Sequence, residues 1–214
     1  MTILPAFAAF EGCDGSGTTT QLRLLEERFR AAGAALPPLF TSAEPGEGPV
    51  GALLRRFLRG DFPLSPLAAS HLFAADRAEH FFGAEGIVPR TQAGYLAVSD
   101  RCVLSSLVYQ GPDAGEAAVL RINERFPLPQ LLLFFDIAPE LAQERLSARP
   151  SRDIFEHLAF QQKARERYLA WAPRFAEWGV HTVIIDAAAP KEEVSEKVWA
   201  ALQNMPILKT RINE

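Results

Sequence analysis

Near its N-terminus the chain reads Ala6-Phe7-Ala8-Ala9-Phe10-Glu11-Gly12-Cys13-Asp14-Gly15-Ser16-Gly17-Thr18-Thr19-Thr20, and this stretch decides the fold. It begins with an apolar run as long as a buried strand and continues into a loop with three glycines. Leu22, Leu25 and Phe29 then fall on one helix face, and Gly33 ends that pattern. The stretch therefore predicts a strand, a glycine-rich loop and an amphipathic helix in direct succession.

The glycine-rich loop has the chemistry of a phosphate-binding site. Its glycines let backbone N–H groups turn toward one anion, and the N-terminus of the following helix adds positive potential. The pattern G-x-x-x-x-G-K-[ST] is met at Gly12, Gly17 and Thr19, whose hydroxyl would bind Mg²⁺, but Thr18 stands in place of the lysine. Asp14 would repel a phosphate, so it is better suited to receive a hydroxyl or to bond its own backbone in the turn. The predicted ATP-binding residues are Gly12, Cys13, Asp14, Gly15, Ser16, Gly17, Thr18 and Thr19.

Short apolar runs alternate with segments of helical period along the rest of the chain, which predicts an α/β fold with a five-stranded parallel sheet flanked by helices. The expected strands are residues 6–10, 39–41, 95–99, 131–137 and 182–185. The expected helices after the first are residues 49–58, 65–82, 105–110, 115–124, 139–146, 153–171 and 191–202. The length of 214 residues predicts a single domain over residues 1–204, and residues 205–214 are expected to form a poorly ordered C-terminal tail.

Composition and charge exclude several classes of protein. Hydrophobic residues make up 48% of the chain and charged residues 22%, which is typical of a globular protein and not of a disordered one. The formal net charge of −4 argues against binding to nucleic acid or to an anionic membrane. No apolar run is long enough to span a bilayer. Two cysteines without a CxxC spacing favour a reducing compartment, so we expect a cytoplasmic protein.

Two Asp-Arg pairs predict a second anion-binding site. Asp100 and Arg101 end the third expected strand, and in open α/β sheets ligands bind beyond the carboxyl ends of the strands. There the carboxylate could order Mg²⁺ and the guanidinium could hold a phosphate, whereas a surface ion pair is the plainer interpretation. Asp76 and Arg77 form the other pair, and Phe73 lies one helical turn before Arg77. The ring and the guanidinium could frame a flat base, although Phe73 would also suit the core.

Together these motifs closely resemble those of thymidylate kinases. The resemblance also includes the runs Ala43-Glu44-Pro45-Gly46 and Ser105-Ser106-Leu107-Val108-Tyr109-Gln110-Gly111, and it extends from about Ala6 to Val198. It implies a P-loop NTPase fold of the nucleoside monophosphate kinase type with a mobile lid. It also implies transfer of the γ-phosphoryl group of ATP to dTMP in dTTP biosynthesis, with Mg²⁺ as cofactor, in a homodimer.

The resemblance also implies roles for individual residues. For the acceptor, Asp14 would meet the 3′-hydroxyl of the deoxyribose, Phe73 would stack on thymine, Arg77 and Ser106 would lie beside the base, Tyr109 would lie near the sugar, and Arg55 and Arg101 would hold the phosphate. Thr19 and Asp100 would serve the metal. The lid would span about residues 145–153, and its Arg149 and Arg152 would join Asp100 and Arg101 as catalytic residues.

Four positions depart from the family pattern, namely Thr18 for lysine, Ala43 for arginine, Cys102 for an aromatic residue or histidine, and Ser151 for aspartate. Loss of the loop lysine removes a cation beside the β- and γ-phosphates, and we expect Arg149 or Arg152 to compensate. Two alternatives therefore remain open from the sequence. One is another nucleotide or deoxynucleoside kinase of this fold, and the other is a nucleotide-binding protein without useful catalysis.

Overall fold

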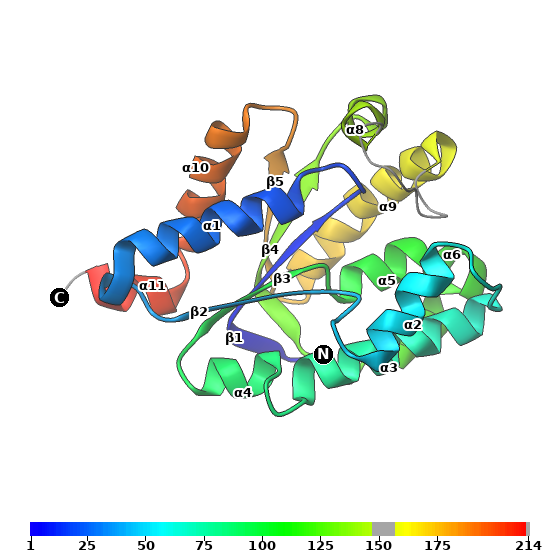
Figure 1. The fold of residues 1–214 in the computed structure, drawn as a ribbon, viewed down its shortest axis with the longest axis horizontal. Helices are drawn as coiled ribbons and strands as arrows, with labels where there is room; N and C mark the ends of the chain where they lie inside the picture. The colour runs from blue at the N-terminus through cyan, green and yellow to red at the C-terminus, as the bar shows by residue number, and fades with distance from the viewer. Residues whose placement is uncertain (147–156, 213–214) are drawn as a thin grey trace.

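A computed structural model describes residues 1–146 and 157–212, with side chains up to residue 209 (Figure 1). Its centre is one sheet of five strands in the order β2-β3-β1-β4-β5, in which every neighbouring pair is parallel. The predicted α/β architecture is confirmed, and each expected strand overlaps an observed one. The strands are β1 (Ile3–Gly12), β2 (Leu39–Ala43), β3 (Leu96–Asp100), β4 (Leu128–Asp136) and β5 (His181–Asp186).

Helices connect the strands and cover both faces of the sheet. The helices of the described ranges are α1 (Thr18–Ala32), α2 (Pro49–Leu58), α3 (Pro66–Phe82), α4 (Ile87–Gln92), α5 (Val103–Tyr109), α6 (Gly111–Ala114), α7 (Glu116–Asn123), α8 (Pro139–Leu146), α9 (Leu158–Glu177), α10 (Lys191–Leu202) and α11 (Pro206–Ile212), with a 3₁₀ turn η1 (Gly33–Ala35). The expected bounds of α2 and α10 are confirmed, and α8 begins at Pro139 as expected and extends to Leu146, where the described range ends. Helices α4 and α6 were not predicted, because segments this short carry too little periodicity to be recognised.

Two hydrophobic cores lie on opposite faces of the sheet because strand residues alternate between them. Phe7 and Ala9 of β1 pack into the core that α3, α5, α7 and α9 cover. Ala8 and Phe10 pack into the other core, beneath α1, α10 and α11. The same alternation places Glu11, at the end of β1, on the side of α5 and α9, where its side chain is fully buried.

One expected helix and the expected lid overlap residues 147–156, which lie outside the described ranges. The expected helix over residues 153–171 is observed as α9 from Leu158 onward, and it runs on to Glu177. Most of the expected lid, with Arg149 and Arg152, lies outside the described residues.

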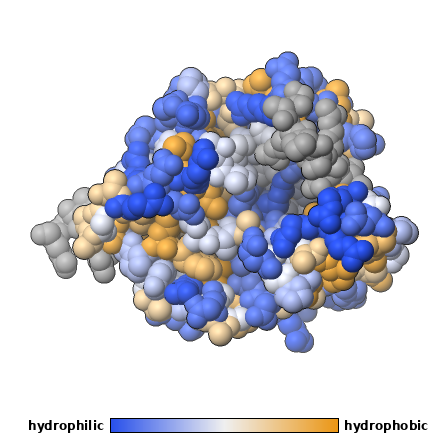
Figure 2. All heavy atoms as spheres, viewed as in Figure 1, coloured by the Kyte–Doolittle hydropathy of each residue, from blue (hydrophilic) through white to orange (hydrophobic). Residues whose placement is uncertain are grey.

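In the rest of the chain, no helix combines the length and the apolar character needed to cross a membrane. On the face shown in Figure 2, hydrophobic residues form separate groups among hydrophilic ones.

The C-terminal segment is not the unstructured tail that the sequence suggests. Residues 206–212 form α11, whose Leu208 is fully buried with Met205 beside the α1 and α10 side of the core. Met205 and Leu208 lie three residues apart, so both face the protein on one turn of helix. Two apolar residues with this spacing are too short a periodic signal to predict a helix, because the residues that follow are polar and indicate an exposed tail.

Substitution of Leu208 by alanine tests whether α11 belongs to the folded domain. We expect the free energy of unfolding to fall by about 2 to 4 kcal/mol, because a fully buried leucine is truncated in a packed core. Urea denaturation measures this difference, with the exposed neighbour Lys209→Ala as control. Equal stability of the two variants would contradict the packing of α11.

Candidate active site

The phosphate loop joins β1 to α1 at the carboxyl edge of the sheet. Gly15 and Gly17 have φ angles of +85° and +94°, which side chains rarely tolerate. The Ser16 N–H donates to the Cys13 carbonyl at 3.0 Å and closes the turn. A Cβ atom at Gly15 would lie 2.5 Å from the carbonyl oxygen of Ala142, so α8 packs directly against the loop. Helix α8 therefore supports the loop on one side, while the loop N–H groups other than that of Ser16 remain available to an anion.

Substitution of Gly15 by alanine should distort this loop. The new methyl group would meet the Ala142 carbonyl and would also occupy a strained φ angle, so we expect a stability loss of roughly 2 kcal/mol or more and a loss of ATP binding. Gly17→Ala is the matched control, because its φ angle is similar but its Cβ would meet no atom within 4 Å. Thermal unfolding and calorimetric titration with ATP measure both effects. Equal losses in the two variants would rule out the contact with α8 as the cause.

Thr19 and Asp100 meet as the metal prediction requires. The Thr19 hydroxyl, in the first turn of α1, donates to Asp100 Oδ2 at 2.7 Å, at the end of β3. Mg²⁺ in phosphoryl-transfer sites usually binds one or two protein oxygens, with waters and substrate phosphates completing its shell. The described residues hold no group of three or more acidic, histidine or cysteine side chains around one point. The pair therefore fits a metal carried in with a nucleotide.

Arg101 follows Asp100 in a strained backbone conformation with a φ angle of 77°. Three contacts hold this turn: the Arg101 N–H donates to the Phe10 carbonyl at 2.8 Å, the Ser99 hydroxyl donates to the Arg101 carbonyl at 2.7 Å, and the Cys102 N–H donates to Glu11 Oε1 at 2.9 Å. The turn aims the Arg101 side chain at the phosphate loop. There Nη2 forms an ion pair with Asp14, and Nη1 donates to the Gly12 carbonyl at 3.2 Å.

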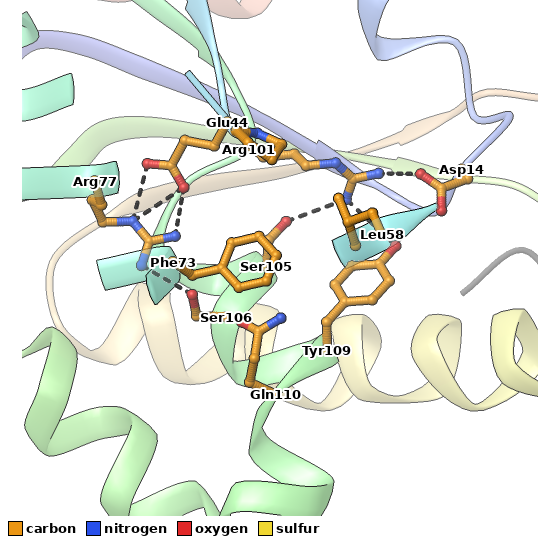
Figure 3. A pocket seen from close by; sticks show the side chains of 11 residues that line it. Asp14, Glu44, Leu58, Phe73, Arg77, Arg101, Ser105, Ser106, Tyr109 and Gln110 are labelled. Carbon is orange, nitrogen blue, oxygen red and sulfur yellow. Dashed lines mark hydrogen bonds and ion pairs between the residues drawn. The ribbon is translucent and has the colours of Figure 1, made fainter. Parts of the chain in front are cut away.

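A cavity of about 560 Å³ opens beside this ion pair (Figure 3). Figure 3 shows Arg77 at one end and the Arg101–Asp14 pair at the other, with the Phe73 ring between them. This volume includes space that is open to solvent, so the lining residues and not the size indicate a ligand. The cavity brings together the predicted residues Asp14, Phe73, Arg77, Arg101, Ser106 and Tyr109. It is also lined by Glu44, Pro45, Leu58, Ser105 and Gln110, which the sequence analysis did not single out as site residues.

At the Arg77 end the guanidinium is bound almost entirely by protein. Its Nε donates to both Glu44 oxygens at 3.0 and 3.1 Å, and its Nη2 contacts Glu44 and the Cys102 carbonyl. Its Nη1 donates to Ser106 Oγ at 2.9 Å and to Asn123. Burial raises the pKa of Glu44, but Arg77 and His80 outweigh it, so the pKa stays below its usual range. Since a guanidinium has five N–H donors, Arg77 has none left for a ligand.

Gln110 is a site residue that sequence reasoning missed. Its side chain is largely buried, lines the cavity, and carries an Oε1 atom that has no hydrogen-bond partner within the described chain. Buried polar atoms are rarely left unpaired without a functional reason. Gln110 lies inside the Ser105 to Gly111 run on which the family resemblance rests, so the signal was present, but an amide alone does not indicate which glutamine faces a ligand.

The predicted acceptor residue Arg55 lies apart from this cavity. Its Nη1 donates to the carbonyls of Pro45 at 3.0 Å and Gly46 at 2.7 Å, and it is absent from the residues that line the space. In the described structure Arg55 therefore braces the Glu44-Pro45-Gly46 segment from α2. Tyr109, by contrast, places its hydroxyl 3.4 Å from Arg101 Nη1, at the phosphate end of the cavity.

The comparisons with known proteins agree with this geometry. A family model described as thymidylate kinase matches residues 10–198. The chain is 38% identical over 194 residues to a "Probable thymidylate kinase" of Pyrobaculum aerophilum, covering 90% of this chain and 94% of the relative. It is 37% identical over 205 residues to a "Thymidylate kinase" of Thermomicrobium roseum, covering 92% and 93%. It is 34% identical over 221 aligned positions to a "Thymidylate kinase" of Geobacillus thermodenitrificans, covering 97% and 94%.

The chain belongs to the thymidylate kinase family. Family membership makes it an ATP-dependent nucleoside monophosphate kinase, and it favours that activity over the alternatives that the sequence left open. The departure at Thr18 is a property of this chain, and the comparisons leave its consequence for activity untested.

A second cavity of about 820 Å³, part of it open to solvent, also borders the phosphate loop of this kinase. Gly15, Gly17 and Thr20 line it, together with Arg145 and Lys191. Arg145 Nη1 donates to the Ala187 carbonyl at 3.0 Å, which ties the end of α8 to the loop after β5. Both cavities thus border the loop, the first at Asp14 and the second at Gly15.

Glu11 is the most strongly perturbed carboxyl group near the loop. Burial raises its pKa from 4.5 to about 7, although hydrogen bonding to Ser105 and the nearby Arg101 lower it in part. Cys13 in the loop is also buried, and burial raises the pKa of its thiol to about 12. Cys13 is therefore a neutral structural thiol at pH 7, which donates to the Gln161 carbonyl.

The Glu11 shift predicts a pH dependence of stability. Between pH 4.5 and about 7 the folded state binds a proton that the unfolded state has released, so the free energy of unfolding falls as the pH rises through this window. The Glu11 contribution is on the order of 3 kcal/mol over the full window. Urea denaturation of the wild type and of Glu11→Gln at pH 5 and pH 8 isolates it. If their stability difference is the same at both pH values, Glu11 does not titrate in this range.

Proposed function

We propose that the 560 Å³ cavity binds dTMP, that ATP binds along the phosphate loop and the 820 Å³ cavity, and that the γ-phosphoryl group passes between them to give dTDP and ADP. The observation that carries this proposal is the arrangement of the first cavity. Its charged end abuts the phosphate loop, and its Arg77 end is closed by hydrogen-bonding and aromatic side chains suited to a base. An acceptor lying along the cavity directs its phosphate at the loop.

At the charged end, Arg101 is the group that holds the acceptor phosphate and Asp14 the group that receives the 3′-hydroxyl. A guanidinium fits a phosphate with two parallel hydrogen bonds, and a carboxylate accepts from a hydroxyl. Their direct ion pair keeps both side chains at this end before a ligand arrives. Gln161 Nε2, from α9, donates to the second Asp14 oxygen at 3.3 Å and helps to fix it.

At the base end, Phe73 provides the stacking surface while Gln110 and Ser106 present polar groups to the edge of thymine. Arg77 acts behind them, because its donors are already engaged with Glu44, Ser106 and main-chain groups. An amide offers both a donor and an acceptor, which matches the N3–H and carbonyl groups of thymine. This refines the expected role of Arg77 from a base contact to a residue that holds the pocket wall.

Mg²⁺ is the proposed cofactor, held by Thr19 and Asp100 together with nucleotide phosphates, where it would neutralise charge on the transferring group. The missing loop lysine removes one cation from the same region. Leu146, at the end of α8, packs over Gly15, and Arg149 follows it by three residues. We assign the compensating charge to Arg149 and Arg152.

A coupled ADP-release assay with ATP, Mg²⁺ and dTMP tests this function. We expect turnover that favours dTMP over dUMP and dCMP, because the family model and the relatives that this chain matches are thymidylate kinases. Turnover that requires Thr18→Lys would show that the native chain binds nucleotides without useful catalysis.

Arg149→Ala with Arg152→Ala should lower kcat by about 10²- to 10³-fold, the usual loss for removing charge stabilisation. Unchanged turnover in that double variant would exclude these arginines as the compensating charge.

Substitution of Gln110 by leucine tests the base end separately. We expect the KM for dTMP to rise about tenfold with little change in the KM for ATP, because one hydrogen bond to the base is lost while the pocket keeps its shape. Steady-state kinetics against each substrate measure the two constants. Gln92→Leu, an exposed glutamine at the end of α4, is the control. A KM for dTMP equal to that of the control would place Gln110 outside the base contact.

We also propose that the protein is a cytoplasmic homodimer. The family resemblance supports the dimer, and the low cysteine content supports a reducing compartment. Exposed apolar side chains on neighbouring helices, Leu53 on α2 and Leu67 on α3, are suited to a contact between copies.

A further inference from the structure

Glu11 accepts four hydrogen bonds, and its side chain is fully buried. Its Oε1 accepts from the N–H groups of Cys102 at 2.9 Å and Ser105 at 3.2 Å, at the start of α5. Its Oε2 accepts from the Ser105 hydroxyl at 2.6 Å and from the Tyr168 hydroxyl of α9 at 3.1 Å. One carboxylate from β1 therefore caps α5, whose own N-cap residue provides no side-chain bond, and also binds α9.

The two hydroxyls connect Glu11 to Arg101. Arg101 Nη1 lies 3.3 Å from Ser105 Oγ and 3.4 Å from the Tyr168 oxygen. Each hydroxyl has a single proton, and the Ser105 and Tyr168 oxygens are also 3.0 Å apart. The Ser105 proton points toward the carboxylate, and the Tyr168 proton points either toward the carboxylate or toward Ser105 Oγ. Both oxygens consequently turn lone pairs toward the guanidinium.

Glu11 also holds the main chain on the far side of Arg101. The left-handed φ angle of 77° at Arg101 persists only where neighbouring contacts enforce it. The bond from Cys102 N–H to Glu11 fixes the peptide that follows Arg101, while the Phe10 carbonyl fixes the peptide that precedes it. Glu11 thus acts on both the backbone and the side-chain position of Arg101, although the two residues share no direct hydrogen bond among the described contacts.

We propose that Glu11 is a positioning residue for phosphoryl acceptance, which orients the Ser105 and Tyr168 hydroxyls so that the Arg101 guanidinium faces the acceptor phosphate. This rests on the proposed function of the cavity and names the residue that prepares its phosphate end. The ionised carboxylate is the form that accepts from all four donors, so the arrangement is complete above pH 7, where Glu11 is ionised. The charged groups acting on Glu11 are Arg101 of the β3–α5 turn, Glu44 at the β2 end and Arg77 of α3. The titratable side chains of Tyr168 on α9 and Cys102 before α5 also interact with it.

Glu11→Gln separates positioning from folding. The amide oxygen of glutamine can still accept from Cys102 and Ser105 N–H, but its NH₂ group must donate to the two hydroxyls and turn their protons toward Arg101. At pH 8 we expect calorimetry to show a ten- to hundredfold weaker affinity for dTMP, and thymidine, which lacks the phosphate, to change by less than about threefold. The variant should unfold at the same urea concentration as the wild type or a higher one, because a buried charge is removed. Glu27→Gln, an exposed carboxylate on α1, is the matched control.

A double-mutant cycle provides the second test. In a Ser105→Ala, Tyr168→Phe background the hydroxyls are gone, so Glu11→Gln should change dTMP affinity by less than about twofold. Equal losses of affinity for dTMP and thymidine, a loss of stability parallel to the loss of affinity, or additive effects in the cycle would each overturn the proposal. Tyr168→Phe alone, which should lower dTMP affinity selectively, decides the matter if Glu11→Gln does not fold.

The readout also distinguishes this proposal from the proposed function. Affinity is measured without turnover, so a wild type that binds dTMP but releases no ADP would overturn the kinase assignment and leave the comparison of Glu11→Gln with wild type intact. Turnover by the wild type together with unchanged dTMP affinity in Glu11→Gln would overturn the positioning role alone.

Discussion

The turn at the end of β3 is the constraint on which the rest of the site depends. Within two residues it places Asp100 beside the Thr19 hydroxyl and Arg101 beside Asp14. The turn requires a left-handed conformation at Arg101 that an arginine adopts at a cost of about 1 to 2 kcal/mol. Contacts from β1 offset this cost, and β1 also carries the phosphate loop. The neighbouring strands β1 and β3 therefore align the phosphate loop with the Arg101 end of the proposed acceptor cavity.

Buried charge is concentrated where the ligand is expected. Glu44 and Arg77 form an almost completely buried ion pair behind the base end, and Glu11 is buried behind the phosphate end. Such groups contribute little net stability, because loss of hydration opposes their attraction. Their effect is geometric, since each fixes polar groups that face the cavity: Glu44 and Arg77 hold Ser106, and Glu11 holds Ser105. The walls of the cavity are thus set before the ligand binds.

The sequence predicts the parts of this structure that depend on neighbours along the chain. The strand, loop and helix around Gly12–Thr19, the sheet, and the meeting of Asp100 with Thr19 all follow from local pattern and from the rule for parallel sheets. Contacts between distant residues were not predictable. Neither the acceptors that saturate Arg77 nor the path from Glu11 to Arg101 leaves a periodic signal. The sequence also does not show that Arg55 meets the Pro45 and Gly46 carbonyls while Arg101 meets Asp14. Helix α11 was missed because its burial depends on surfaces of α1 and α10.

The absent loop lysine is tolerable in physical terms because phosphoryl transfer needs positive charge near the transferring group more than it needs that charge from one direction. Helix α8 packs against Gly15 through the Ala142 carbonyl. A lysine at position 18 would supply its cation from within the loop, whereas under our proposal Arg149 and Arg152, in the sequence that follows α8, supply it. The charge need not come from the loop itself, provided that it reaches the transferring group from another part of the chain.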